Sequence, residues 1–143
     1  MTRVATALLL ILLGWQAPAA AATPVVTQAW IRVLPGDLPL AGYLVLRNPT
    51  GETLTLTGAH SPAFAAIEIH RSSSQSGVAR MQRYERLDIP PHATVTFEPG
   101  GYHLMLFDRR HALQPGESLT LTLEFADGSS LPVPFALREA GAR

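Results

Sequence analysis

Short segments of alternating apolar and polar residues recur along most of this chain, and they constrain its fold more than any other feature. Residues 118–125, SLTLTLEF, alternate leucine and phenylalanine with threonine and glutamate, the period of a half-buried β-strand. Turn residues such as Asn-Pro-Thr-Gly at 48–51 separate the segments. The predicted strands cover residues 25–34, 41–48, 53–59, 64–70, 78–85, 94–98, 102–107, 118–125 and 131–137. Short strands at this spacing predict an all-β sandwich or barrel with Greek-key connections.

Two segments carry more specific expectations. Pro132 and Pro134 lie in the last predicted strand, and since proline donates no backbone hydrogen bond, that strand should be an edge strand or be paired on one side only. The serine-rich stretch RSSSQSG at 71–77 shows no apolar alternation, so we expect a mobile hairpin loop there.

The N-terminal residues predict export from the cytoplasm. Arg3 precedes an apolar run and then an alanine-rich stretch, the layout of a secretory signal peptide. The apolar run is shorter than the roughly 20 residues that a spanning helix needs; a short membrane anchor is the alternative. We expect residues 1–22 to be a cleaved signal peptide and residues 23–143 to form a single domain, periplasmic and not inserted in the membrane.

Charge and cysteine content exclude several classes of function. Without Arg3 the chain has 10 basic residues, all arginine, against 11 acidic ones, so no basic excess predicts binding to nucleic acid or to an anionic membrane. Cysteine is absent. We therefore expect no lipid anchor on cysteine and no thiolate in any metal site, which also excludes a blue-copper electron carrier.

Histidine and methionine supply the candidate chemistry. In the segment YHLMLF at 102–107, His103 and Met105 should share one strand face while Leu104 and Leu106 face the core. If residues 64–70 and 78–85 form a hairpin, His70 and Met81 come close together. Imidazole and thioether together suit copper(I), because thioether is a poor ligand for zinc, magnesium or calcium.

The order and spacing of these residues resemble a known family. His70, Met81, His103 and Met105 follow the pattern H-x10-M-x21-H-x-M of the periplasmic copper chaperones called PCu(A)C. The stretches AWIRVLP, AGYLVLRNPTGE and FEPGGYHLMLFD are also similar to that family. The resemblance implies a single-domain, cupredoxin-like Greek-key β-sandwich that binds one copper(I) per chain through these four residues.

The resemblance also implies partners. The family supplies copper to the binuclear copper centre of cytochrome c oxidase, alone or with a thioredoxin-like copper assembly protein. We expect a monomer that transfers copper by ligand exchange. Some relatives carry a histidine- and methionine-rich tail that binds copper(II), whereas this chain ends in LREAGAR, so at most weak copper(II) binding is expected.

Other interpretations compete with this one. Taken singly, each of the four residues is more often a packing or hydrogen-bonding residue than a ligand. Alternative functions are an Ig-like extracytoplasmic binding module without metal, or copper storage or resistance. An enzyme is not expected, because no G-x-S-x-G motif accompanies the serines after His70. His60, His92 and His111 are predicted to lie in solvated loops, Glu68 to be a surface carboxylate rather than a partner of His70, and Trp30 and Tyr43 to fill the core.

Overall fold

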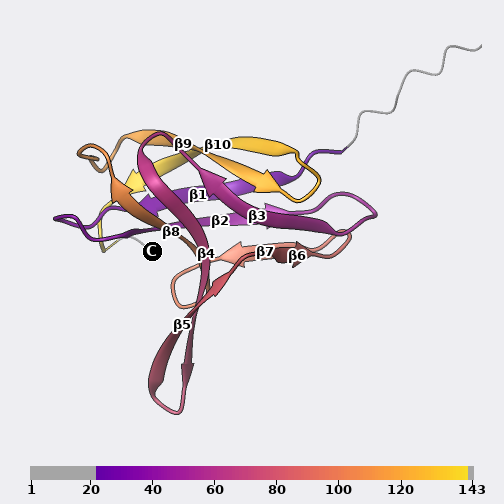
Figure 1. Ribbon diagram of the computed structural model, residues 1–143, viewed down its shortest axis with the longest axis horizontal. Helices are drawn as coiled ribbons and strands as arrows, with labels where there is room; N and C mark the ends of the chain where they lie inside the picture. Colours follow the sequence, from indigo (N-terminus) through magenta and orange to yellow (C-terminus); the bar gives the residue numbers. More distant parts are fainter. Residues whose placement is uncertain (1–21, 142–143) are drawn as a thin grey trace, which may run out of the picture.

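The computed structural model describes residues 22–141, which form ten β-strands and no helix (Figure 1). The predicted signal peptide lies outside the described residues except for its last position. The strands are β1 Val25–Arg32, β2 Leu40–Arg47, β3 Leu54–His60, β4 Phe64–Gln75, β5 Val78–Tyr84, β6 Leu87–Ile89, β7 Thr94–Phe97, β8 Tyr102–Arg109, β9 Ser118–Phe125 and β10 Ser130–Arg138. In this part of the chain no helix is long and apolar enough to cross a membrane.

All ten strands belong to one hydrogen-bonded sheet, in the order β5-β4-β8-β7-β2-β1-β10-β9-β3-β6. Most neighbours are not consecutive in the chain, and the pairing of β1 with β10 is parallel. The sheet curls, since β3 and β4 contact each other although they are far apart in its order. Strands from both halves therefore enclose one core, as a cupredoxin-like β-sandwich requires, and the predicted all-β fold is confirmed.

The core follows directly from the period-two pattern. Leu44 and Leu46 of β2, Leu104 and Leu106 of β8, and Leu121 and Leu123 of β9 are all buried in one cluster. Alternate residues of β2 and β8 consequently face away from this core, and that outer face carries the candidate ligands. The core position of Leu104 and Leu106 confirms the prediction for residues 102–107.

The serine-rich stretch differs from its prediction. β4 continues through Gln75, and only Ser76 and Gly77 form the turn before β5. Both turn residues have positive φ, 53° and 76°, as a two-residue type I′ hairpin requires. The prediction of a loop at residues 71–77 is therefore wrong. Backbone pairing with β5 keeps these residues extended, although their side chains bury too little to create an apolar pattern.

The proline-rich last strand is paired on both sides, but not along its whole length. β10 pairs with β9 from Ser130 to Ala136, whereas its pairing with β1 begins only at Ala136. Pro132 and Pro134 thus lie where β10 has a partner on one side only, which is the second of the two arrangements that the sequence predicted.

Candidate metal centre

The two histidines of the predicted ligand set lie directly opposite each other. His70 of β4 pairs with His103 of β8, and their ring centroids are 5.9 Å apart. Directly paired residues of antiparallel strands point to the same face of a sheet. The pairing of these strands, which are more than thirty residues apart in the sequence, therefore brings both imidazoles to one place.

The two methionines share this face. Met105 lies two residues after His103 on β8 and is paired with Glu68. Met81 of β5 is opposite Ser72, which is two residues after His70, so Met81 is a diagonal neighbour of His70 on the same face. The fold thus gathers all four predicted residues from three adjacent strands.

The four side chains differ in exposure. His103 is buried, with 5% of its surface exposed, whereas Met81 is 53% exposed. His70 and Met105 are half-buried. The arrangement therefore has a closed side at β8 and an open side at β5.

Hydrogen bonds define which nitrogen of each histidine is free. The Nε2–H of His70 donates to Oε2 of Glu68 at 2.8 Å, and the Nδ1–H of His103 donates to the carbonyl oxygen of Gly101 at 3.2 Å. A carboxylate and a carbonyl can only accept, so each neutral ring keeps its lone pair on the other nitrogen. Nδ1 of His70 is buried and has no hydrogen-bond partner. Such an orphaned nitrogen fits a metal ligand.

Glu68 has a larger part in the site than the sequence indicated. Its second carboxylate oxygen, Oε1, forms an ion pair with Nη1 of Arg83 at 3.3 Å, so the two oxygens of this carboxylate contact Arg83 and His70. The expectation of a plain surface carboxylate is wrong. The period-two rule already placed Glu68 on the face of His70, but the contact depends on side-chain geometry that spacing does not reveal.

Burial disfavours the protonated form of His103. Loss of contact with water lowers the pKa of His103 below its ordinary value of 6.5, its bond to Gly101 partly raises the pKa again, and the nearby His70 lowers it. Only a neutral imidazole can donate its free nitrogen to a metal. Burial thus favours the protonation state that a ligand needs.

Aromatic residues extend the same face beyond the candidate ligands. Ala41 of β2 pairs with Met105, so Tyr43, two residues on, also faces outward, and Tyr43 pairs with Trp30 of β1. The rings of Trp30 and Tyr43 lie 4.6 Å apart. Both are buried, but outside the main hydrophobic cluster. Their burial agrees with the prediction that they fill the core, but they pack over the outer face of the sheet and not within that cluster.

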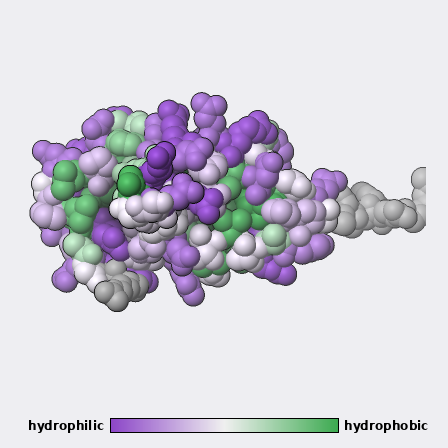
Figure 2. All heavy atoms as spheres, turned by 90° about the horizontal axis from the view of Figure 1, so that it is seen from below, coloured by the Kyte–Doolittle hydropathy of each residue, from purple (hydrophilic) through white to green (hydrophobic). Residues whose placement is uncertain are grey.

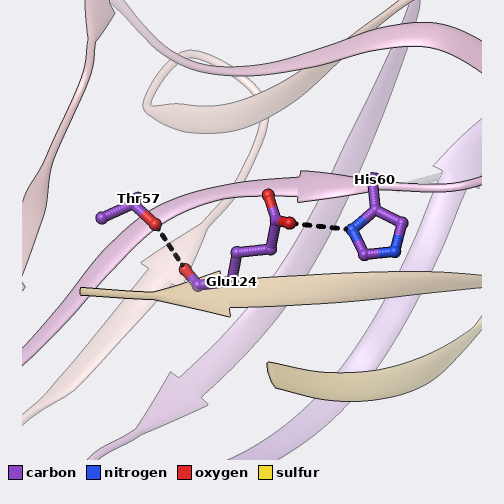
Figure 3. Close-up of polar contacts among 3 residues, drawn as sticks. All are labelled: Thr57, His60 and Glu124. Atoms are coloured by element: carbon purple, nitrogen blue, oxygen red, sulfur yellow. Dashed lines mark hydrogen bonds and ion pairs between the residues drawn. The ribbon is translucent and has the colours of Figure 1, made fainter. Parts of the chain in front are cut away.

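The remaining histidines lie elsewhere. His60 is the last residue of β3 rather than a loop residue, and its Nδ1 lies 3.0 Å from Oε1 of Glu124 on β9 (Figure 3). Figure 3 also shows Thr57 bonded to the backbone of Glu124. His92 and His111 are exposed and lie outside the strands, as predicted. Within residues 22–141, no three His, Cys, Asp or Glu side chains form a group that could hold a metal.

Solved structures with the same fold include two that hold copper. The copper-bound PCuAC domain from PmoF2 is 23% identical, with a TM-score of 0.70, and covers 85% of this chain and 97% of that domain. The copper(I) form of DR1885 from Deinococcus radiodurans is 26% identical, with a TM-score of 0.64, and covers 88% of this chain and 83% of that protein. The fold is thus that of PCuAC domains, and the resemblance seen in the sequence is confirmed.

The family model described as "Putative lipoprotein LpqE-like" matches residues 25–137, and the chain belongs to this family. Among curated relatives, "Putative lipoprotein Lxx21020" of Leifsonia xyli is 30% identical over 130 residues, covering 85% of this chain and 78% of the relative. "Uncharacterized protein RP573" of Rickettsia prowazekii is 31% identical over 90 residues, covering 62% of this chain and 50% of the relative.

Proposed function

We propose that this protein is an extracytoplasmic copper(I) carrier that binds one copper through His70, Met81, His103 and Met105. The observation that carries the proposal is the cross-strand pair of His70 and His103, with Nδ1 of His70 buried and unpartnered. Two thioethers on the same face complete a neutral donor set, which leaves a copper(I) complex with a charge of +1. This set favours copper(I) over copper(II), whose usual donors are nitrogen and oxygen.

The unequal exposure of the ligands supports transfer rather than permanent storage. Met81 is the most exposed of the four, and thioethers are weak donors that exchange readily. An acceptor can therefore replace Met81 first, while the more buried His103 still holds the metal. On the family resemblance, we propose the copper-bearing subunit of cytochrome c oxidase, or a thioredoxin-like assembly protein, as acceptor, and the periplasm as location. The lipoprotein names of the family and of the Leifsonia relative are consistent with a place outside the cytoplasm.

The first test is an anaerobic copper(I) titration of the domain against a chromophoric chelator, with the protein mass measured in parallel. We expect one copper per chain with a Kd of about 1 nM or tighter, equivalent to about −12 kcal/mol, and a monomeric protein. Failure to compete with the chelator would exclude the carrier function and favour a binding module without metal. Binding of several copper ions per chain would favour storage.

A further inference from the structure

The strand that carries Met81 forms a free edge of the sheet. β5 stands at the end of the strand order, and its only partner in the described part of the chain is β4. Residues 78–83 are all exposed, and the β4–β5 hairpin projects from the body of the domain (Figure 1). A free edge of this kind presents unpaired backbone N–H and C=O groups that can accept another strand.

The geometry of the turn identifies the groups that point outward. In a two-residue hairpin the residues flanking the turn, here Gln75 and Val78, exchange both backbone hydrogen bonds, and the following pairs alternate. Ser72 and Met81 are then a pair without mutual hydrogen bonds. The N–H of Ser72 indeed points the other way, to the carbonyl of Gly101 at 3.0 Å. The backbone of Met81 therefore faces the free edge, as do those of Ala79 and Arg83.

A strand added at this edge would bring its side chains to the candidate metal centre. One of its residues would lie opposite Met81 on the same face, with the two Cβ atoms about 5 Å apart. A donor side chain at that position could therefore reach copper held by Met81. The incoming strand would deliver a new ligand next to the most exposed existing one.

The charge of the hairpin indicates the chemistry of that strand. Arg71, Arg80 and Arg83 lie on β4 and β5, and of these only Arg83 forms an ion pair with a carboxylate within residues 22–141. No arginine lies in β3, β6 or β9, at the opposite end of the strand order, and β6 and β9 each contain one acidic residue. Seen from the side toward which the hairpin projects, the surface is mainly hydrophilic, with hydrophobic residues in separate groups (Figure 2). A second copy of β5 would bring further arginines to this edge, whereas an acidic strand would complement those already there.

We propose that β5 is a docking edge to which an extended, acidic segment of the copper acceptor adds as a further strand. This inference rests on the proposed carrier function. During transfer, the bond between copper and the Met81 sulfur breaks as a bond to the acceptor's donor atom forms, and copper remains in the +1 state. The edge thus determines which acceptors can take copper from the protein.

Ala79 allows a test that leaves the candidate ligands intact. Proline at this position removes an N–H that points to the free edge and not to β4, so Ala79→Pro blocks an added strand while the hairpin remains. Ala79→Val is the matched control, since valine keeps the N–H. The probe is a short synthetic peptide of alternating glutamate and valine with a central cysteine, and the same peptide with lysine in place of glutamate.

We expect the glutamate peptide to shift the amide resonances of Ala79, Met81 and Arg83, and to bind the native protein and Ala79→Val equally. Ala79→Pro should bind it at least about tenfold more weakly (~1.4 kcal/mol), and Arg80→Glu should reverse the preference between the two peptides. Chelator competition should give the same copper(I) affinity for all these proteins.

Several outcomes would overturn the inference. The first is that the glutamate peptide binds Ala79→Pro as tightly as it binds the native protein. The second is that the glutamate and lysine peptides bind the native protein equally. The third is that the glutamate peptide shifts none of the three amide resonances. A dimer that Ala79→Pro abolishes would make a second copy the occupant, and would overturn it as well. If the native protein does not bind copper(I) at all, the carrier function itself is rejected.

Discussion

The four candidate ligands are buried to different degrees, and this predicts different consequences for removing each of them. A side chain that is mostly exposed contributes little to folding, so its removal changes metal binding alone. A buried side chain affects both properties. Met81 is therefore the position at which ligation and stability can be separated.

Met81→Ala should lower the copper(I) affinity at least about tenfold, equivalent to ~1.4 kcal/mol, without changing the melting temperature of the metal-free protein. The reason is the loss of one thioether donor from a side chain that is 53% exposed. Anaerobic chelator competition and calorimetry measure the two quantities. His92→Ala, in an exposed turn, is the control and should bind copper like the native protein. Equal affinities in the two variants would contradict the assignment of Met81.

Glu68→Ala should weaken copper(I) binding by about 10-fold or more, in the range typical of residues that orient a metal-bound histidine. Glu68 holds Nε2–H of His70 at 2.8 Å and thereby leaves Nδ1 free. Nitrogen NMR of the metal-free protein reports the tautomer directly: Nε2–H should dominate in the native protein and lose that dominance in the variant. A single unchanged tautomer in Glu68→Ala would show that the carboxylate does not orient His70.

The buried His103 predicts a pH dependence of folding. Its pKa in the folded protein is lowered from the ordinary 6.5, chiefly by burial, so between these two pKa values the unfolded chain binds more protons than the folded one. The free energy of unfolding is therefore fully retained above about pH 6.5 and decreases as the pH falls below it. Urea unfolding at several pH values should show a shallower dependence for His103→Gln than for the native protein. Identical slopes would mean that His103 does not contribute.

At the scale of the strands, the sequence predicts a strand correctly where one of its faces is buried and the other is exposed. β9 alternates because one face is buried and the other is not. Residues 71–75 have no such contrast, and β6, although it alternates, has only three residues, too few to be recognised. A strand held by backbone pairing alone cannot be recognised from hydrophobic periodicity.

Local sequence patterns likewise predict only part of the candidate centre. Period two on β8 and a hairpin between β4 and β5 suffice to group His103 with Met105 and His70 with Met81. Trp30 and Tyr43 could not be assigned to this face, because their position depends on the pairing of β2 with β8. Strand pairs of this kind are distant in the sequence, and local patterns contain no information about them.

Asn48 shows how one polar residue can stabilise several elements. It is completely buried, and its Nδ2 donates to the carbonyls of Glu52, Ile89 and Pro90 while its Oδ1 accepts from Thr50. Asn48→Ala would remove all of these bonds, including the buried one to the carbonyl of Ile89, so we expect a loss of roughly 3 kcal/mol in unfolding free energy, measured by urea unfolding. Copper(I) affinity should stay unchanged in the folded variant. A loss below about 1 kcal/mol would indicate that water replaces these bonds.

At the scale of the whole molecule, stability is distributed unevenly. The core cluster draws on both halves of the sheet, whereas β5 is exposed along nearly its whole length. Opening of the hairpin therefore exposes little buried surface to water and should occur far more often than global unfolding. The candidate ligand on β5 thus lies on a strand that buries little surface, and those on β8 lie next to the core.

Copper should change this distribution, because a metal bound by β4, β5 and β8 makes opening of the hairpin require the loss of a ligand. We expect copper(I) to slow amide exchange in residues 71–75 and 78–84 at least about tenfold (~1.4 kcal/mol), as measured by anaerobic hydrogen exchange with mass spectrometry. The turn at 126–129, which can open without disturbing any candidate ligand, should keep its rate. In Met81→Ala, copper held by the other three residues should no longer protect β5. Equal slowing of the hairpin and the turn would mean that the metal does not join these strands.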